Sequence, residues 1–220
     1  MTKPVEKEAK ITGTEIVSIQ DRIKQRLARV NETTAEATGN NISLKGSMFR
    51  LPSGATSQGP LECIIIDYGN QNAYYPNTYV EGEFSPPSCS AIGRIPSEMA
   101  PKASVEKPES AKCEGCPHNE WGSKGRGKAC SNSILLAILP SDFTSESDVL
   151  AVKVAAKGLT RWSNYVRELE MSGWDPANVI TELSFMPGLS YPSLVFKNIG
   201  PSGRMDDIGP FLSQSDLLLS

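Results

Sequence analysis

The chain has 220 residues, with 22 Lys and Arg against 25 Asp and Glu, and a formal net charge of −3 does not by itself indicate a nucleic-acid-binding protein. Its 39% apolar residues suffice for one sizeable domain with tails, or for two small domains. The longest apolar runs, such as 134–139, are too short to span a membrane, and no apolar leader follows Met1, so we expect a cytoplasmic protein without membrane contact.

The first predicted element is an amphipathic helix near the N-terminus. Thr12 and Glu15 have the spacing of a capping box. Apolar side chains then recur at steps of three and four, at Ile16, Ile19, Ile23, Leu27 and Val30. Its other face is basic, so the helix either packs on its own domain or serves as an arm for a partner or for self-association. The polar stretch that follows is expected to be a linker, which places the first segment at 1–41.

Short β-strands are predicted from residue 42 onward, beginning around 48–51. The run 61–68 is β-branched and apolar, as expected of a buried strand, and 67–70 is expected to turn the chain back. Cys63 lies inside that apolar run, so we interpret it as a core thiol rather than a ligand.

Four further cysteines, Cys89, Cys113, Cys116 and Cys130, are the most informative feature of the sequence. They are separated by 23, 2 and 13 residues, and Cys113-Glu-Gly-Cys116 has the form of a zinc knuckle. The stretch 106–130 is rich in turn formers and poor in apolar residues, so we expect a structural Zn²⁺ to hold it. His118, two residues past the knuckle, is an alternate ligand. Two disulfides are the competing interpretation and would require an oxidising compartment.

After the cysteines, the order of predicted elements is two strands, a helix and two strands. They are expected at 133–139, 149–155, 159–171, 179–185 and 193–196. In the helix, apolar residues including Trp162 and Tyr165 share one face. This order predicts a β-rich α+β fold, an OB-like partly open barrel, with a split zinc ribbon as the second possibility. We place the core at 42–200, a zinc-binding insertion at about 85–132, and a flexible acidic and apolar C-terminal tail at 201–220.

The sequence offers little support for catalysis. His118-Asn-Glu120 matches the His-x-Glu of zinc deaminases, but the knuckle precedes it instead of following, and a closed four-thiolate site has no position for water. The glycine-rich stretch 122–128 follows no predicted strand and opens no helix, unlike a phosphate-binding loop. We therefore expect a protein without enzymatic activity.

A binding function fits the residues better. A glycine-rich strip carries one aromatic ring and three cations, and tyrosines lie upstream of it. The residues concerned are Trp121, Lys124, Arg126 and Lys128, with Tyr74, Tyr75 and Tyr79. Exposed rings that stack bases beside cations that contact phosphates are what single-stranded nucleic acid requires. The plainer interpretation is a solvated loop beside core tyrosines.

In this order of elements, over about 49–196, the chain resembles the zinc-containing, T4-type helix-destabilising proteins, the single-stranded DNA-binding proteins of tailed phages. The resemblance rests on the knuckle after a tyrosine-rich segment, the strands 135–140 and 149–154, the helix with Trp162 and Tyr165, and the closing strands 179–185 and 191–196. The family's site has one histidine and three cysteines, so a fourth cysteine or His118 would complete it here.

The resemblance implies an OB-fold core with an inserted zinc subdomain, a basic N-terminal arm and an acidic C-terminal tail. It also implies single-stranded DNA binding in phage DNA replication or recombination, in the cytoplasm of the host cell. The tail would recruit replication or recombination proteins. The alternative function is a zinc-stabilised, protein-binding adaptor or transcription regulator without strand-binding activity.

Overall fold

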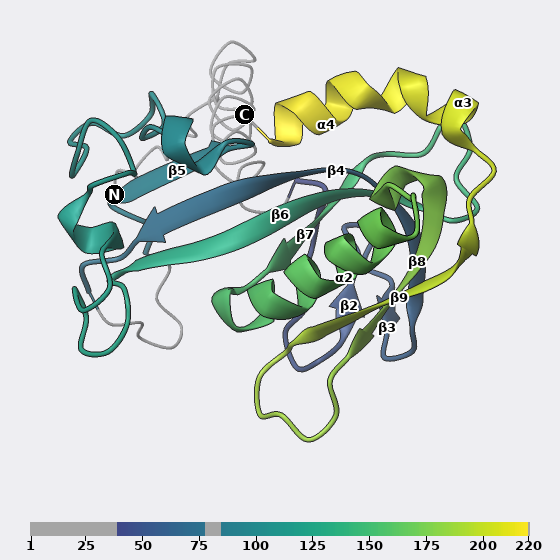
Figure 1. Cartoon of the computed structure of the whole chain (residues 1–220), viewed down its shortest axis with the longest axis horizontal. Coiled ribbons are helices and arrows are strands. Elements are labelled where there is room, and N and C mark those ends of the chain that lie inside the picture. The colour runs from purple at the N-terminus through teal and green to yellow at the C-terminus, as the bar shows by residue number, and fades with distance from the viewer. Residues whose placement is uncertain (1–38, 78–84, 220) are drawn as a thin grey trace, which may run out of the picture. The chain divides into compact units, whose positions relative to one another are not determined.

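A curled sheet of seven strands organises the residues that this computed structural model describes, 39–77 and 85–219 (Figure 1). Along the sheet the strands are β1 (Asn41–Ile42), β7 (Leu150–Val154), β6 (Cys130–Pro140), β4 (Leu61–Tyr74), β8 (Val179–Phe185) and β9 (Leu194–Pro201), and β5 (Cys89–Gly93) also pairs with β4. A separate hairpin joins β2 (Phe49–Arg50) to β3 (Thr56–Ser57). From Asn40 onward the chain forms one compact unit. The predicted N-terminal helix and Tyr79 lie outside the described residues.

Strand β4 is the centre of this sheet because it pairs with three others. It is antiparallel to β6 along most of its length, to β8 through its first residues, and to β5 through its last five. The turn predicted at 67–70 is wrong, since those residues continue the strand past a bulge between Ile65 and Asp67. Gly69 is required for close packing rather than for a turn, because a Cβ atom at this position would lie only 3.3 Å from Leu219 Cδ2.

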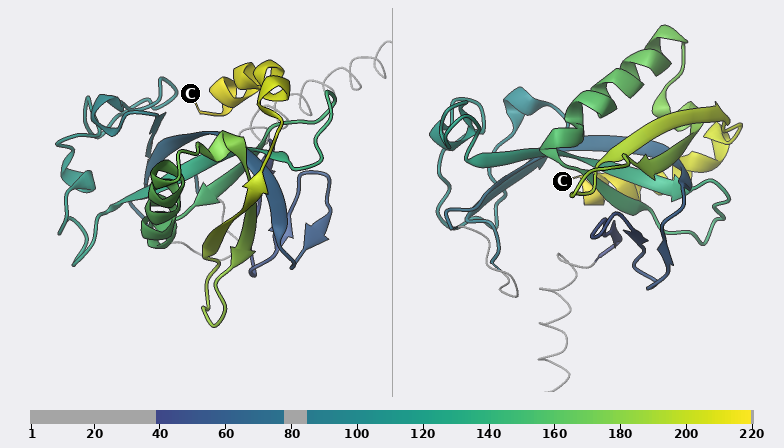
Figure 2. Two further views of the ribbon diagram at one scale, coloured as in Figure 1. Left: turned by 45° about the vertical axis from the view of Figure 1, so that its right-hand side comes forward. Right: turned by 90° about the horizontal axis from the view of Figure 1, so that it is seen from below.

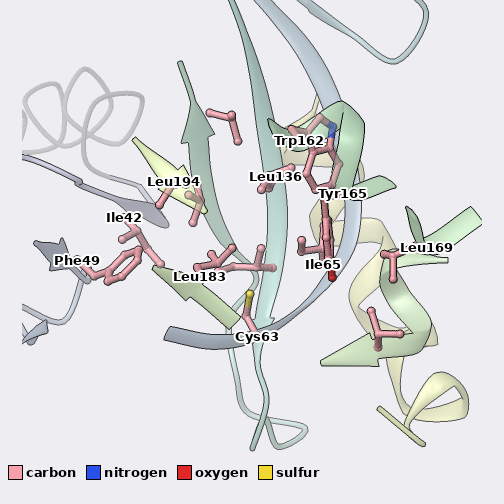
Figure 3. Packing of buried hydrophobic residues seen from close by; sticks show 14 residues of the cluster. Ile42, Phe49, Cys63, Ile65, Leu136, Trp162, Tyr165, Leu169, Leu183 and Leu194 are labelled. Atoms are coloured by element: carbon pink, nitrogen blue, oxygen red, sulfur yellow. The ribbon is translucent and has the colours of Figure 1, made fainter. Parts of the chain in front are cut away.

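One face of the sheet is covered by α2 (Leu159–Met171), whose predicted bounds are confirmed. Trp162, Tyr165 and Leu169 are buried on it and pack with sheet residues such as Ile65 and Leu136 (Figure 3). Cys63 is fully buried in the same cluster, which confirms it as a core thiol. The helix therefore buries one apolar stripe, as its sequence period predicted.

The other face is covered by the C-terminal segment, which contains α3 (Met205–Ile208), the 3₁₀ turn η5 (Gly209–Phe211) and α4 (Leu212–Leu218) (Figure 2). Ile208, Phe211 and Leu219 are buried against sheet residues such as Ile64 and Leu135. The prediction of a flexible tail at 201–220 is wrong for the residues that the structure describes. Spacings of three and four residues along this segment place its buried side chains on one helical face.

Four further 3₁₀ turns connect these elements: η1 (Pro96–Glu98), η2 (Pro117–Asn119), η3 (Ala156–Gly158) and η4 (Pro176–Asn178). Turn η3 runs directly into α2, so the end of β7 and the start of the helix form one continuous corner. Within residues 39–77 and 85–219, no helix has the length and apolar character needed to cross a bilayer.

Candidate functional site

The four cysteines predicted to bind zinc do not form a metal site. Over the described part of the chain, no group of three or more His, Cys, Asp or Glu side chains is arranged to hold a metal ion. The prediction of a Zn²⁺ cofactor, and with it the zinc-binding character of the insertion, is therefore wrong. His118, the predicted alternate ligand, stacks on Tyr74 with ring centroids 4.0 Å apart, and its Nε2 lies 3.2 Å from Glu109 Oε2.

Four of the cysteines stand near one another, since Cys89, Cys113 and Cys116 all affect the pKa of Cys130. Cys89 and Cys130 are both in register with Tyr74, on the two strands that flank the end of β4. Burial raises the pKa of Cys130 to about 11, and the neighbouring thiols of Cys113, Cys116 and Cys89 add to this shift. Burial also raises the pKa of Cys113. No cysteine is in a disulfide, so the competing interpretation of two disulfides is wrong as well.

Hydrogen bonds, rather than a metal, order the cysteine segment. The Asn132 amide donates to Asn72 Oδ1 at 2.6 Å and to Asn119 Oδ1 at 2.9 Å, and the Asn119 amide donates to the Cys113 carbonyl at 3.0 Å. The Cys113 amide donates to the Met99 carbonyl at 2.9 Å, and both side chains are buried in a small cluster with Ala91. Because asparagines of the sheet bind the segment directly, it needs little apolar surface of its own.

A polar hollow of about 730 Å³ lies over these asparagines, and we call it the asparagine hollow. Its polar lining comes from the ends of β4 and β6, η1, the cysteine segment and α2. It comprises Asn70, Asn72, Ser97, Glu114, Asn119, Glu120, Lys128, Asn132, Ser133 and Ser163. Pro96, Met99, Ile134 and Leu159 supply its apolar wall. The hollow thus combines hydrogen-bonding groups with a flat apolar surface.

A second hollow, of about 570 Å³, is mainly apolar and carries three lysines, and we call it the lysine pocket. Lys45, Lys153 and Lys157 line it together with Tyr191, and the Lys157 ammonium lies 3.9 Å from the Tyr191 ring centroid. Among the described residues that line it there is no Asp or Glu. Desolvation lowers the pKa of Lys153, and a bound anion would favour its charged form.

The predicted basic strip is only partly assembled. The Trp121 side chain is 77% exposed, and the Lys128 ammonium lies 5.7 Å from its ring centroid and 3.4 Å from Asn119 Oδ1. Lys124 and Arg126 are exposed on a tight turn closed by hydrogen bonds between Lys124 and Gly127. Of the predicted tyrosines, Tyr75 is 42% exposed, whereas one face of Tyr74 is covered by His118.

The two hollows share a wall. The consecutive residues Ser131 and Asn132 of β6 line one hollow each, and so do Gly158 and Leu159 at the start of α2. The N-terminus of α2 between them has no side-chain cap, and its first amide, that of Leu159, donates to the Ala156 carbonyl of η3.

Arg161 braces this wall. It donates from Nε to the Leu194 carbonyl at 3.0 Å, from Nη2 to the Lys157 carbonyl at 3.3 Å, and also to the Ser193 hydroxyl. These bonds hold the β8–β9 loop, which carries Tyr191, against η3.

Sequence reasoning missed the lysine pocket because its residues come from four distant segments, near 45, 131, 153–158 and 191–194. The one local signal was Lys153, a charge inside the apolar strand β7. Comparison of the chain with models of protein families, with curated proteins and with solved structures finds no match. The function is therefore argued from the geometry of the two hollows and the rings beside them.

Proposed function

We propose that this protein binds single-stranded DNA, stacking bases on exposed rings and holding phosphates with lysines, and that it has no catalytic activity. The observation that carries the proposal is a pair of aromatic–lysine contacts on separate loops. Lys157 lies over Tyr191 and Lys128 lies over Trp121. The Trp121 ring is exposed and the Tyr191 ring is half-buried, and a base stacked on such a ring contributes about 1–3 kcal/mol.

The topology supports an OB-like assignment for the core. Strands β4, β6 and β7 precede α2, and β8 and β9 follow it, with β4 paired to both β6 and β8. OB-folds bind oligonucleotides on strands 2 and 3 and on the loops after strands 1 and 4. If β4 is counted as strand 1, those loops are 75–129, which carries Trp121, and 186–193, which carries Tyr191. Both aromatic–lysine pairs thus include a ring on a loop expected to bind.

The distribution of charge supports the same surface as the binding site for DNA. The whole chain has a net charge of −3, yet the lysine pocket presents three cations without a lining carboxylate in the described residues. A phosphate backbone that passes the pocket would meet Lys45, Lys153 and Lys157. A role in phage DNA replication or recombination, as the resemblance implies, belongs to this proposal.

Fluorescence anisotropy with a labelled dT oligonucleotide, and with a duplex of the same length as comparison, tests the function. We expect preference for the single strand, and a loss of about 5- to 150-fold in Tyr191→Ala and in Trp121→Ala, the fold equivalent of about 1–3 kcal/mol. Trp174→Ala is the matched control, since that ring is also exposed but lines neither hollow. Equal effects of all three changes would refute the proposed surface.

A salt titration separates this function from that of a protein-binding adaptor. For single strands, log affinity falls with log salt by about 0.7 per phosphate neutralised. Replacing Lys45, Lys153 and Lys157 by Gln should therefore reduce the slope by about 2. Absence of affinity for the dT oligonucleotide at low salt would exclude strand binding and leave the adaptor function.

A further inference from the structure

We propose that the asparagine hollow recognises one base of the bound strand and prefers a base with an exocyclic amino group over thymine. This inference rests on the proposed strand binding and concerns a part of the molecule that stacking and phosphate contacts do not require. It follows from which hydrogen-bonding atoms of the hollow are already used and which are left.

The orientation of the amides is set by a chain of contacts that starts at Lys128. An ammonium can only donate, so the atom of Asn119 that faces Lys128 at 3.4 Å is its oxygen. That oxygen also accepts from Asn132 at 2.9 Å, which identifies the Asn132 atom as nitrogen. The same nitrogen donates to Asn72 Oδ1 at 2.6 Å. Asn132 Oδ1 is then left as an acceptor, and no hydrogen bond reaches it from the described residues.

Asn70 is fixed in a similar way. Its amide nitrogen faces two backbone carbonyls, those of Arg94 at 3.0 Å and Gly93 at 3.5 Å, so its Oδ1 is also left as an acceptor. Glu114 and Glu120 add carboxylates to the same lining, and both residues are exposed. The unused polar groups of the asparagine hollow therefore include four accepting side chains, beside the donors of Lys128, Ser97 and Ser163.

A ligand for such a lining must donate hydrogen bonds and present an apolar face. Adenine, cytosine and guanine carry an amino group, which amide and carboxylate oxygens can accept from. Thymine offers one N–H between two carbonyl oxygens, which would face the acceptors of the hollow unfavourably. Pro96, Ile134 and Leu159 provide the apolar surface for the plane of the base. The phosphate would stay outside, away from Glu114 and Glu120.

The asparagine hollow lies where it could contact a DNA strand that is bound in the proposed way. Lys128 both lines the hollow and lies over the exposed ring of Trp121. A base stacked on Trp121 therefore has a neighbour beside the hollow, and the shared wall leads on to the lysine pocket. A volume of about 730 Å³ exceeds the needs of a single ion and can admit a base with water.

The test compares a labelled dT oligonucleotide with one in which a single central dT is replaced by dA. The protein can shift its register to place the preferred base, so one dA should raise affinity by at least about 5-fold, the lower end of one good base contact. Replacement of that dA by deoxynebularine, which is the same purine without its amino group, should abolish the gain. A single replacement also avoids the helical stacking of long dA runs.

Glu120→Gln, at an exposed position, should reduce the ratio of the affinity for the dA oligonucleotide to that for dT. Asn132→Ala should do the same if it folds, and Glu106→Gln is the matched control because it lies in the same connection outside the hollow. Equal affinity for all oligonucleotides, or a dA gain untouched by both variants, would overturn the inference while strand binding stands. Loss of dT binding in the wild type would instead mean that the proposed function fails. Displacement of the oligonucleotide by a lysine-rich peptide, with no base preference, would assign the hollow to a protein partner and would also overturn it.

Discussion

The packing of the C-terminal segment can be tested by removing one buried ring. Phe211 is 3% exposed and meets Phe143 edge-on, with centroids 5.3 Å apart. Arg204 lies over the Phe143 ring at 3.7 Å and donates to the Phe143 carbonyl at 2.7 Å. A buried Phe removes about 150 Å² or more from water. At about 25 cal/mol per Å², that area corresponds to about 4 kcal/mol.

We therefore expect Phe211→Ala to lower the free energy of unfolding by about 4 kcal/mol, within the usual range of about 3–5 for this change in a core. Urea unfolding followed by circular dichroism measures this change, since the free energy of unfolding of a domain is about 5–15 kcal/mol in total. Leu217→Ala is the matched control in α4, because that side chain is 79% exposed and should change stability by about 0.5 kcal/mol or less.

The reasoning fails if Phe211→Ala costs less than about 1 kcal/mol, because a ring buried in a native core cannot be removed so cheaply. It fails equally if a chain that lacks Met205 to Ser220 unfolds at the same urea concentration as the full chain. Either result would mean that this segment is a mobile tail, as its composition alone predicts. A large loss of unfolding free energy, with unchanged affinity for dT at low urea, would show that the segment stabilises the sheet without binding DNA.

Three further predictions follow from single contacts. Burial raises the pKa of Cys130 from 9.0 to about 11, so stability due to its protonated thiol should be complete below pH 9.0 and fall as pH rises toward 11. Cys130→Ser should flatten that fall in urea unfolding measured across this range. Asn132→Ala loses two hydrogen bonds and should destabilise the fold by about 1–3 kcal/mol, and an unchanged melting temperature would contradict the network. Arg161→Lys keeps the charge but loses the forked contact with Leu194 and Ser193, so dT affinity should fall more than stability does.

Local periodicity predicted the elements that pack by a single face. The helix 159–171 and the strand 179–185 have the predicted bounds, and Cys63 and Trp162 are buried as expected. In each case the signal lies within a window of a few residues, and tertiary contacts reinforce it. The strip at Trp121 was likewise visible in the sequence, although only Lys128 lies over the ring.

Features that depend on residues far apart in the chain could not be predicted from local sequence patterns. The turn signal at 67–70 is overridden because β6 and β5 both pair with that part of β4, and because Leu219 needs the space beside Gly69. The knuckle spacing of Cys113 and Cys116 predicted a metal, but asparagines 72, 119 and 132 supply the bonds that order the segment. No spacing rule relates those three asparagines, since their proximity is created by the β4–β6 register and the loop between the strands.

Together, the two hollows indicate how a bound DNA strand would be oriented on the protein. The lysine pocket offers cations without lining carboxylates in the described residues, whereas the asparagine hollow offers acceptors and two glutamates. A phosphate is attracted to the first and repelled by the second, and the amino edge of a base has the opposite preference. A nucleotide at the shared wall of 131–132 and 158–159 would therefore point its phosphate toward the lysines and its base toward the asparagines. If a strand binds as proposed, this polarity would let a chain with a net charge of −3 hold a polyanion, because the acids near the interface would face bases rather than phosphates.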